Sequence, residues 1–248
     1  MDAKDYKKNG YFLEEIGLVD SIKNIRNRCI EVFNQAAILH DLPEVKNDED
    51  VIDLYHSKHR DVWVAAYDQL RFLPEVMELC GKPEVINAAK NAGIQFPSQC
   101  LHPMLRVDMP SDDQFLFYQH QDYVYNLGSQ NSITVWMPLQ DIDKEIGQLG
   151  VLPGSHRGGH KACDEKGILL KYDRSKEIKV PVKVGQALVF SQFLEHESGK
   201  NRSNKIRFAF QIRFNDLAEK DYAMRNYYLN KTTSTKSLKV DFKTYFPD

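Results

Sequence analysis

Two His-x-Asp triplets are the residues of this chain whose type and spacing could place a metal ion. They are His59-Arg60-Asp61 and His120-Gln121-Asp122. The first triplet opens a helical pattern, where residues two apart point to different sides, so it is explained as solvated first-turn residues. The second ends a predicted strand, where residues two apart share a face and can both reach one ion. This difference favours His120 and Asp122 as metal ligands.

A third ligand is predicted at His196, which follows an apolar strand pattern and precedes Ser198-Gly199. Two neutral imidazoles and one carboxylate on one face of an octahedron leave three positions open. That facial triad is typical of non-haem iron(II) oxygenases. Zinc also accepts two histidines and one aspartate, so the ligand set by itself leaves a zinc hydrolase open.

Arg207 is a candidate for holding the far end of an acidic cosubstrate. If 2-oxoglutarate chelates the metal through its C1 carboxylate and keto oxygen, its C5 carboxylate needs a fixed cation deeper in the fold. Arg207 lies 11 residues after His196, on the polar face of the next predicted strand. A planar guanidinium binds a carboxylate through two parallel hydrogen bonds. A surface arginine on an edge strand is the plainer alternative, and the spacing from His196 favours the cosubstrate site.

The elements that must position these residues change in character near residue 95. Before it, apolar residues recur at helical spacing in three stretches: from Ser21 to Ala36, from Asp61 to near Pro74, and from Pro83 to Gly93. After Pro97 the apolar period becomes two, which indicates strands. The predicted strands are Cys100–Asp108, Gln114–His120, Ser132–Leu139, Leu149–Leu152, Ile178–Lys183, Ala187–Ser191 and Ile206–Phe214. Helices followed by short strands predict an α+β fold with helices laid on one sheet face.

The alternation in the last strand bears on where the polar side chains point. Its apolar set is Ile206, Phe208, Phe210, Ile212 and Phe214, and its other set is Arg207, Ala209, Gln211 and Arg213. An ordinary sandwich would bury the first set and leave the second in water. If the helices instead cover the outer sheet face, the apolar set packs against them and the polar set lines a cavity. The helical first hundred residues favour this second arrangement.

Composition narrows the class of protein. The formal net charge is −2 and 42% of residues are hydrophobic, so no global field favours nucleic acid or an anionic membrane. Apolar runs are far too short for a bilayer span, and no apolar signal segment follows the polar opening. The four cysteines, Cys29, Cys80, Cys100 and Cys163, have no CxxC spacing. Reduced thiols and a cytoplasmic location are therefore expected.

Taken in order, these motifs resemble the phytanoyl-CoA dioxygenase family over roughly residues 100 to 215. The resemblance is carried by His120-Gln-Asp122, the segment 136–143 that begins with Trp136, the segment 147–156 ending in Pro-Gly-Ser-His, His196-Glu-Ser198 and Arg207. It implies a double-stranded β-helix, also called a jelly roll or cupin-like fold, with iron at the mouth between its sheets. It further implies iron binding by His120, Asp122 and His196.

The resemblance also implies how the cosubstrate is held. Arg207 and Ser198 would bind the distal carboxylate of 2-oxoglutarate, and Trp136 would flank the cosubstrate. Thr134 and Tyr118 are additional candidate contacts. Related halogenases have a small residue in place of the metal aspartate. Because Asp122 is present, hydroxylation or another C–H oxidation is favoured over halogenation.

The expected function is that of an iron(II)- and 2-oxoglutarate-dependent dioxygenase that hydroxylates a small-molecule metabolite and releases succinate and CO₂. Its cofactors would be Fe(II), 2-oxoglutarate and O₂, with ascorbate as a stimulant, and no catalytic residue beyond the metal ligands is needed. We expect no nucleic-acid or membrane partner. A cupin-type zinc or manganese isomerase or hydrolase and a non-catalytic ligand-binding jelly roll remain alternatives. One domain is expected over 1–248: mainly helical over 1–95, a jelly-roll core over 96–216 and an extension over 217–248.

Overall fold

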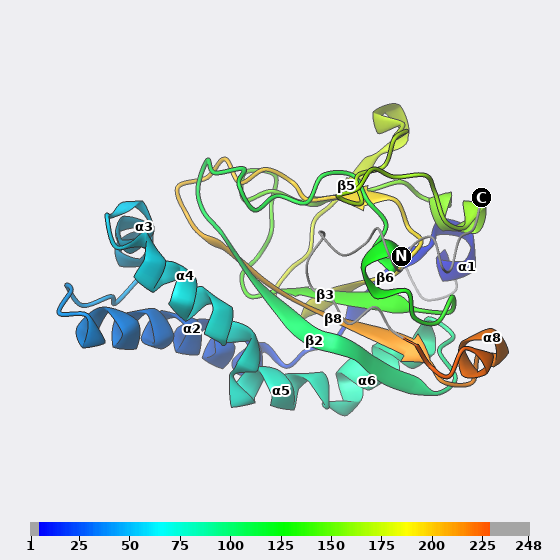
Figure 1. The fold of residues 1–248 in the computed structure, drawn as a ribbon, viewed down its shortest axis with the longest axis horizontal. Coiled ribbons are helices and arrows are strands. Elements are labelled where there is room, and N and C mark those ends of the chain that lie inside the picture. The colour runs from blue at the N-terminus through cyan, green and yellow to red at the C-terminus, as the bar shows by residue number, and fades with distance from the viewer. Residues whose placement is uncertain (1–4, 229–248) are drawn as a thin grey trace.

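The computed structural model describes residues 5–228, and its helices lie mostly before residue 95 (Figure 1). Apolar faces drive the helices into the core: the largest helix, α2, buries Ile22, Ile25 and Phe33. Local signals set the helix ends, since Asn47 caps α3 by accepting from two backbone N–H groups and prolines occupy the first turns of α5 and α6. The helices are α1 (Tyr6–Asn9), α2 (Val19–Leu39), α3 (Asp48–His56), α4 (Arg60–Gln69), α5 (Pro74–Cys80), α6 (Pro83–Asn91), α7 (Tyr123–Asn126) and α8 (Lys220–Met224), with short 3-10 turns between some of them.

Two antiparallel sheets form the other part of the molecule. The larger has the order β1-β6-β3-β8-β2 and the smaller β5-β4-β7. Their strands are β1 (Tyr11–Glu15), β2 (Pro97–Asp108), β3 (Ile133–Pro138), β4 (Leu149–Val151), β5 (Ile178–Val180), β6 (Gln186–Ser191), β7 (His196–Glu197) and β8 (Arg207–Asp216). In Figure 1 the helices α2, α5 and α6 lie along one face of the large sheet, and the small sheet lies on its other side. The expected α+β jelly roll with helices on one sheet face is thus confirmed.

Strand β8 shows which face of the large sheet meets which layer. Phe208, Phe210 and Ile212 belong to the apolar cluster that includes the helix residues Phe33 and Trp63. The alternate residues Arg207, Ala209, Gln211 and Arg213 line a cavity on the opposite face. The second of the two arrangements considered for this strand is therefore confirmed. The helices take up the apolar face, which frees the other face to carry charged groups.

Several predicted boundaries are corrected by the structure. Gln114–His120 is not a strand: its only ladder contact is an isolated bridge between His120 and His196. Strand β1 was not predicted, and it forms by pairing with β6, which is distant in the sequence. The short strand β7 and the helices α1, α3, α5, α7 and α8 were also not predicted. The helix predicted up to Gly93 ends near there, with Gly93 at φ +93°, in the left-handed region.

Three other expectations concern the C-terminal extension, the cysteines and membrane-spanning segments. The extension contains α8, whose Tyr222 is buried, while residues 229–248 lie outside the described residues. All four cysteines are free thiols in this structure. Among residues 5–228, no helix combines the length and apolar character needed to cross a membrane.

Candidate metal centre

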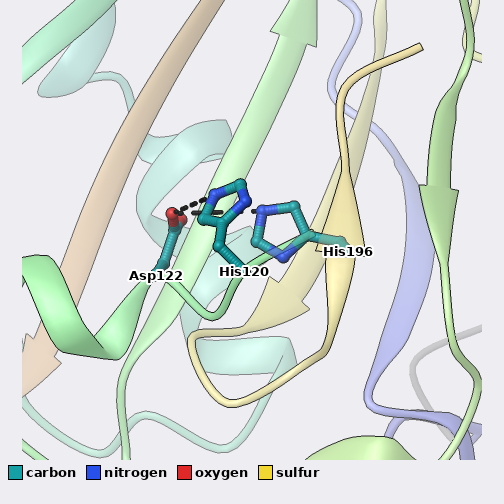
Figure 2. Close-up of side chains that lie close together, drawn as sticks. All are labelled: His120, Asp122 and His196. Atoms are coloured by element: carbon teal, nitrogen blue, oxygen red, sulfur yellow. Dashed lines mark ion pairs between the residues drawn. The ribbon is translucent and has the colours of Figure 1, made fainter. Parts of the chain in front are cut away.

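The side chains of His120, Asp122 and His196 point toward one another, although His196 is distant in the sequence from the other two (Figure 2). One ligand atom from each lies within 4.8 Å of the others, and all three residues are buried. The His120 Nε2 atom lies 3.4 Å from Asp122 Oδ1, and the His196 Nε2 atom lies 3.9 Å from the same oxygen. These separations suit three donors arranged around a single cation. The predicted triad is thus brought together.

A backbone bridge brings the two imidazoles together. The N–H of His120 donates to the His196 carbonyl at 2.9 Å, and the N–H of His196 donates back at 3.1 Å. In such a hydrogen-bonded pair the side chains lie side by side, and here the ring centroids are 4.1 Å apart. Asp122 is not in a strand, because it precedes α7 with helical backbone angles. The ligands share one site through this bridge and the following turn, rather than through the strand pattern we predicted.

The hydrogen bonds of the rings decide which nitrogens face the site. His120 Nδ1 lies 2.7 Å from the Tyr118 carbonyl oxygen, and His196 Nδ1 lies 2.9 Å from the Leu194 carbonyl oxygen. A carbonyl can only accept, so each Nδ1 must carry the proton and each Nε2 presents a lone pair. Burial, followed by the repulsion of His120, lowers the pKa of His196 to about 3. His196 is therefore neutral at pH 7, as a metal ligand must be.

Asp122 is held by two neighbouring strands of the large sheet. Arg213 on β8 donates from Nε to Oδ2 at 3.1 Å and from Nη2 to Oδ1 at 3.0 Å. Thr134 on β3, which lies opposite Arg213, donates its hydroxyl to Oδ2 at 2.6 Å. Burial alone would raise the pKa of Asp122, but the positive charge of Arg213 outweighs this and lowers it well below its usual value. The carboxylate is therefore ionised and fixed in orientation.

The middle residue of the triplet fastens the loops around the site. The Gln121 amide donates to the carbonyls of Gly159 and Phe193 at 2.9 and 2.6 Å. Its oxygen accepts from the Lys161 N–H at 2.9 Å. This fully buried amide joins the 153–161 loop to the segment that leads into His196.

A cavity opens beside the three ligands. Its walls combine aromatic and aliphatic groups with several charged ones, which is typical of a small-molecule site. The lining residues are Arg106, Asp108, Phe117, His120, Trp136, Leu149, Phe190, His196, Ser198, Arg207, Ala209, Gln211 and Arg213. The cavity therefore unites the imidazoles with the predicted cosubstrate residues Arg207, Ser198 and Trp136.

The two further candidate contacts lie elsewhere. The Thr134 hydroxyl contacts the Asp122 carboxylate, as described above, and Thr134 is not among the lining residues. The Tyr118 side chain is 48% exposed, and only its carbonyl oxygen reaches the site, through His120. His59 and Asp61, of the first triplet, lie at the N-terminus of α4 and belong to no cluster of metal-ligating side chains in the part of the chain described.

Two charged residues of the site, Arg106 and Asp108, were not singled out from the sequence, and Arg213 was named there only as part of a polar strand face. Arg106 and Asp108 lie two apart on β2, and Asp108 lies opposite Arg207 on β8. Arg213 occupies the same face of β8 as Arg207. The i, i+2 spacing was a signal that these side chains share a face. The pairing of β2 with β8, which places them in the cavity, is not readable from local sequence.

Comparison with known proteins places the chain in a family. The sequence model described as "Phytanoyl-CoA dioxygenase (PhyH)" matches residues 6–209. The chain belongs to the phytanoyl-CoA dioxygenase family. It is 25% identical over 235 residues to the mouse protein named "Phytanoyl-CoA dioxygenase, peroxisomal", an alignment that covers 85% of this chain and 66% of that protein. The chain spans between a third and two thirds of the length of the curated relatives it matches.

Solved structures of other proteins show a similar fold. The apo form of ThoJ, described as a non-heme monooxygenase, has a TM-score of 0.64 at 18% identity, covering 86% of this chain and 76% of that one. The epimerase SnoN, in complex with Fe³⁺, alpha ketoglutarate and nogalamycin RO, has a TM-score of 0.54 at 14% identity, covering 86% and 82%. At 18% and 14% identity, the structural similarity bears on the fold alone, and it agrees with the jelly-roll fold of this chain.

Proposed function

We propose that this protein is an iron(II)- and 2-oxoglutarate-dependent oxygenase that hydroxylates, or otherwise oxidises, a C–H bond of a small metabolite. The observation that carries the proposal is the presence of two imidazole Nε2 atoms and an ionised carboxylate beside one cavity that also contains a buried arginine, Arg207. This donor set fits a facial iron(II) site and leaves coordination positions for a cosubstrate and O₂. SnoN, which has the same fold, was solved with iron and alpha ketoglutarate bound.

In this proposal His120, Asp122 and His196 hold the metal. Bound iron(II) would supply the O₂ activation that couples oxidative decarboxylation of 2-oxoglutarate, to succinate and CO₂, with oxidation of the substrate. Arg207 and Ser198 would hold the distal carboxylate of the cosubstrate, and Trp136 would flank it. Thr134 would orient Asp122 through the hydrogen bond from its hydroxyl. Tyr118 would orient His120 through its backbone carbonyl oxygen.

The protein's own contribution is positioning and exclusion of water. The backbone bridge and the Nδ1 hydrogen bonds fix the two imidazoles, and Arg213 fixes Asp122. Part of the cavity wall is apolar and would keep bulk water from the reacting atoms; it is formed by Phe117, Leu149 and Phe190. No general base is needed for hydrogen abstraction, so the site requires no further titrating residue. The single domain over 1–248 and the cytoplasmic location expected from the sequence remain part of this proposal, as does a small-molecule substrate.

Succinate formation from 2-oxoglutarate by the 248-residue chain tests this function. The purified protein, supplied with Fe(II), ascorbate and O₂, is expected to release succinate even without a substrate, through uncoupled turnover. Asp122→Ala and His196→Ala are expected to abolish this release. Asp61→Ala is the matched control, since Asp61 is an exposed residue of the other His-x-Asp triplet. Folded, iron-loaded wild-type protein that forms no succinate would instead favour a cupin-type zinc or manganese enzyme or a ligand-binding protein.

A further inference from the structure

Arg207 does not stand alone in the cavity, because it shares the Asp108 carboxylate with a second arginine. Arg207 donates to Asp108 Oδ2 from Nε at 3.1 Å and from Nη2 at 3.0 Å. Arg106 donates to the other oxygen, Oδ1, and also to the Phe115 carbonyl. Its guanidinium lies 4.7 Å from the centre of the Phe117 ring. All three residues are buried, with exposed fractions of 6% for Arg106, 4% for Asp108 and 3% for Arg207.

The charges of this cluster do not cancel. Both guanidinium groups are protonated at any ordinary pH. Burial raises the pKa of Asp108, but the charges and hydrogen bonds of Arg106 and Arg207 outweigh this and hold it below its usual value. Asp108 is therefore ionised, and the three groups carry one net positive charge. The remaining charged wall residue, Arg213, is already paired with Asp122.

Arg207 by itself offers little to an incoming anion. Its Nη1 group donates to the carbonyls of Gly147 and Gly199 at 2.6 and 2.7 Å. With the two bonds to Asp108, four of its five N–H groups are engaged. Its charge is also partly offset by Asp108, which it shares with Arg106. One N–H group of Arg207 is left over.

Arg106 has more N–H groups available for an incoming anion than Arg207 has. Both of its recorded side-chain hydrogen bonds come from Nη2. Its Nε and Nη1 groups have no hydrogen-bond partner among the residues that the structure describes, and its side chain lines the cavity. Leaving a buried cation without a counter-ion is costly, so a cluster with one surplus positive charge is built to receive one carboxylate.

We propose that Arg106 is a second cosubstrate-binding residue, and that Arg106, Asp108 and Arg207 together form the site for a single carboxylate group. Arg106 gives this site its net positive charge, because Asp108, which pairs with both arginines, offsets only one of their two charges. Asp108 orients both guanidinium groups and limits the site to one anion. This inference rests on the proposed function, in which that anion is the C5 carboxylate of 2-oxoglutarate.

Binding of 2-oxoglutarate to the full-length protein loaded with Mn²⁺, measured by titration calorimetry without O₂, tests the inference separately from turnover. Arg106→Met is expected to weaken binding about 10- to 100-fold, the usual effect of losing a charge-assisted contact. Arg106→Lys, which keeps the charge, is expected to stay within a few-fold of wild type. Arg106→Met combined with Asp108→Asn restores the single surplus charge and is expected to recover most of the lost affinity.

Arg26→Met is the matched control. Arg26 is likewise paired with an aspartate, Asp48, and lies over an aromatic ring, that of Phe208, but on the helix side of the sheet. Its replacement is expected to leave 2-oxoglutarate binding unchanged. The single variant Asp108→Asn, which keeps both arginines, is expected to bind 2-oxoglutarate at least as tightly as wild type. This result tests the inference even if Arg106→Met does not fold.

The results that overturn the inference differ from those that overturn the function. If Arg106→Met binds like wild type, if the double variant binds as weakly as Arg106→Met, or if Asp108→Asn alone weakens binding, then Arg106 does not supply the charge of this site. If wild-type, metal-loaded protein binds no 2-oxoglutarate at all, the proposed function itself fails. A purely structural role for Arg106 would not explain recovery in the double variant. In that case the replacement of a second buried side chain would be expected to weaken binding further.

Discussion

Replacing Arg213 by methionine is expected to destabilise the metal-free protein through the carboxylate that it leaves behind. Asp122 is 1% exposed and Arg213 is 8% exposed, and their two hydrogen bonds form a fork at 3.0 and 3.1 Å. Methionine has similar length and no charge, so the variant keeps much of the packing. What it removes is the counter-ion of a buried anion.

The size of the effect follows from this burial. Removing one partner of a buried ion pair costs about 3–5 kcal/mol, because the other charge stays out of water without compensation. Thr134 still donates to Asp122 Oδ2, which favours the lower end of that range. A loss of about 3 kcal/mol corresponds to a fall in melting temperature of roughly 6–12 °C for a domain of this size.

Thermal unfolding followed by circular dichroism, first with a chelator and then with excess Mn²⁺, measures this effect. A divalent cation at the site replaces the missing guanidinium as the counter-ion of Asp122. Mn²⁺ is therefore expected to raise the melting temperature of Arg213→Met by more than it raises that of wild type. Asp122→Asn combined with Arg213→Met removes both charges, so the double variant is expected to be more stable without metal than Arg213→Met alone.

Three outcomes would refute this reasoning. One is a metal-free Arg213→Met protein whose melting temperature equals that of wild type, because Asp122 would then not depend on its partner. Another is a double variant no more stable than Arg213→Met, because the cost would then come from lost packing rather than from an unpaired charge. An equal response of both proteins to Mn²⁺ would show that the guanidinium and the metal do not act on the same carboxylate.

Three further predictions concern residues other than the metal ligands. Gly147→Ala places a Cβ about 2.7 Å from the Lys200 carbonyl oxygen at a residue with φ +100°. The Gly147 carbonyl accepts a hydrogen bond from Arg207, so a shift of this backbone would displace Arg207. We expect the KM for 2-oxoglutarate, measured by succinate release, to rise roughly 10- to 100-fold with a smaller change in kcat. Burial raises the pKa of Asp216, but backbone N–H donors outweigh this and lower it, so its contribution to stability is present above the ordinary value of 3.8 and is lost as the pH falls below it. The difference in unfolding free energy between wild type and Asp216→Asn should therefore shrink below pH 3.8 in urea titrations, and a constant difference would contradict this. Trp63→Ala, at a fully buried residue of the helical layer, should cost about 3–5 kcal/mol of unfolding free energy while metal-dependent succinate release per folded molecule stays near wild type.

Much of the architecture could be predicted from local sequence because its signals are local. The spacing of apolar residues gave helices α2, α4 and α6, and the alternation in β8 gave the division between its packed and cavity-lining faces. Both patterns reflect a single element meeting a single apolar layer. Most of the missed elements, such as β1 and α5, have few residues each. Their formation depends on neighbours supplied by the rest of the fold.

The amino-acid sequence by itself determined the chemistry available: two histidines and an aspartate with ligand spacing, and an arginine 11 residues after the second histidine. Only the tertiary structure decided how those groups meet. His120 and His196 are joined by one backbone bridge rather than by a strand, and Asp122 is oriented by Arg213. The pairing of β2 with β8 sets Arg106 and Asp108 beside Arg207, which turns a lone cation into a cluster of known net charge. Local patterns report which face a side chain takes, whereas the charge balance of a buried site depends on strands that are distant in the chain and adjacent only after folding.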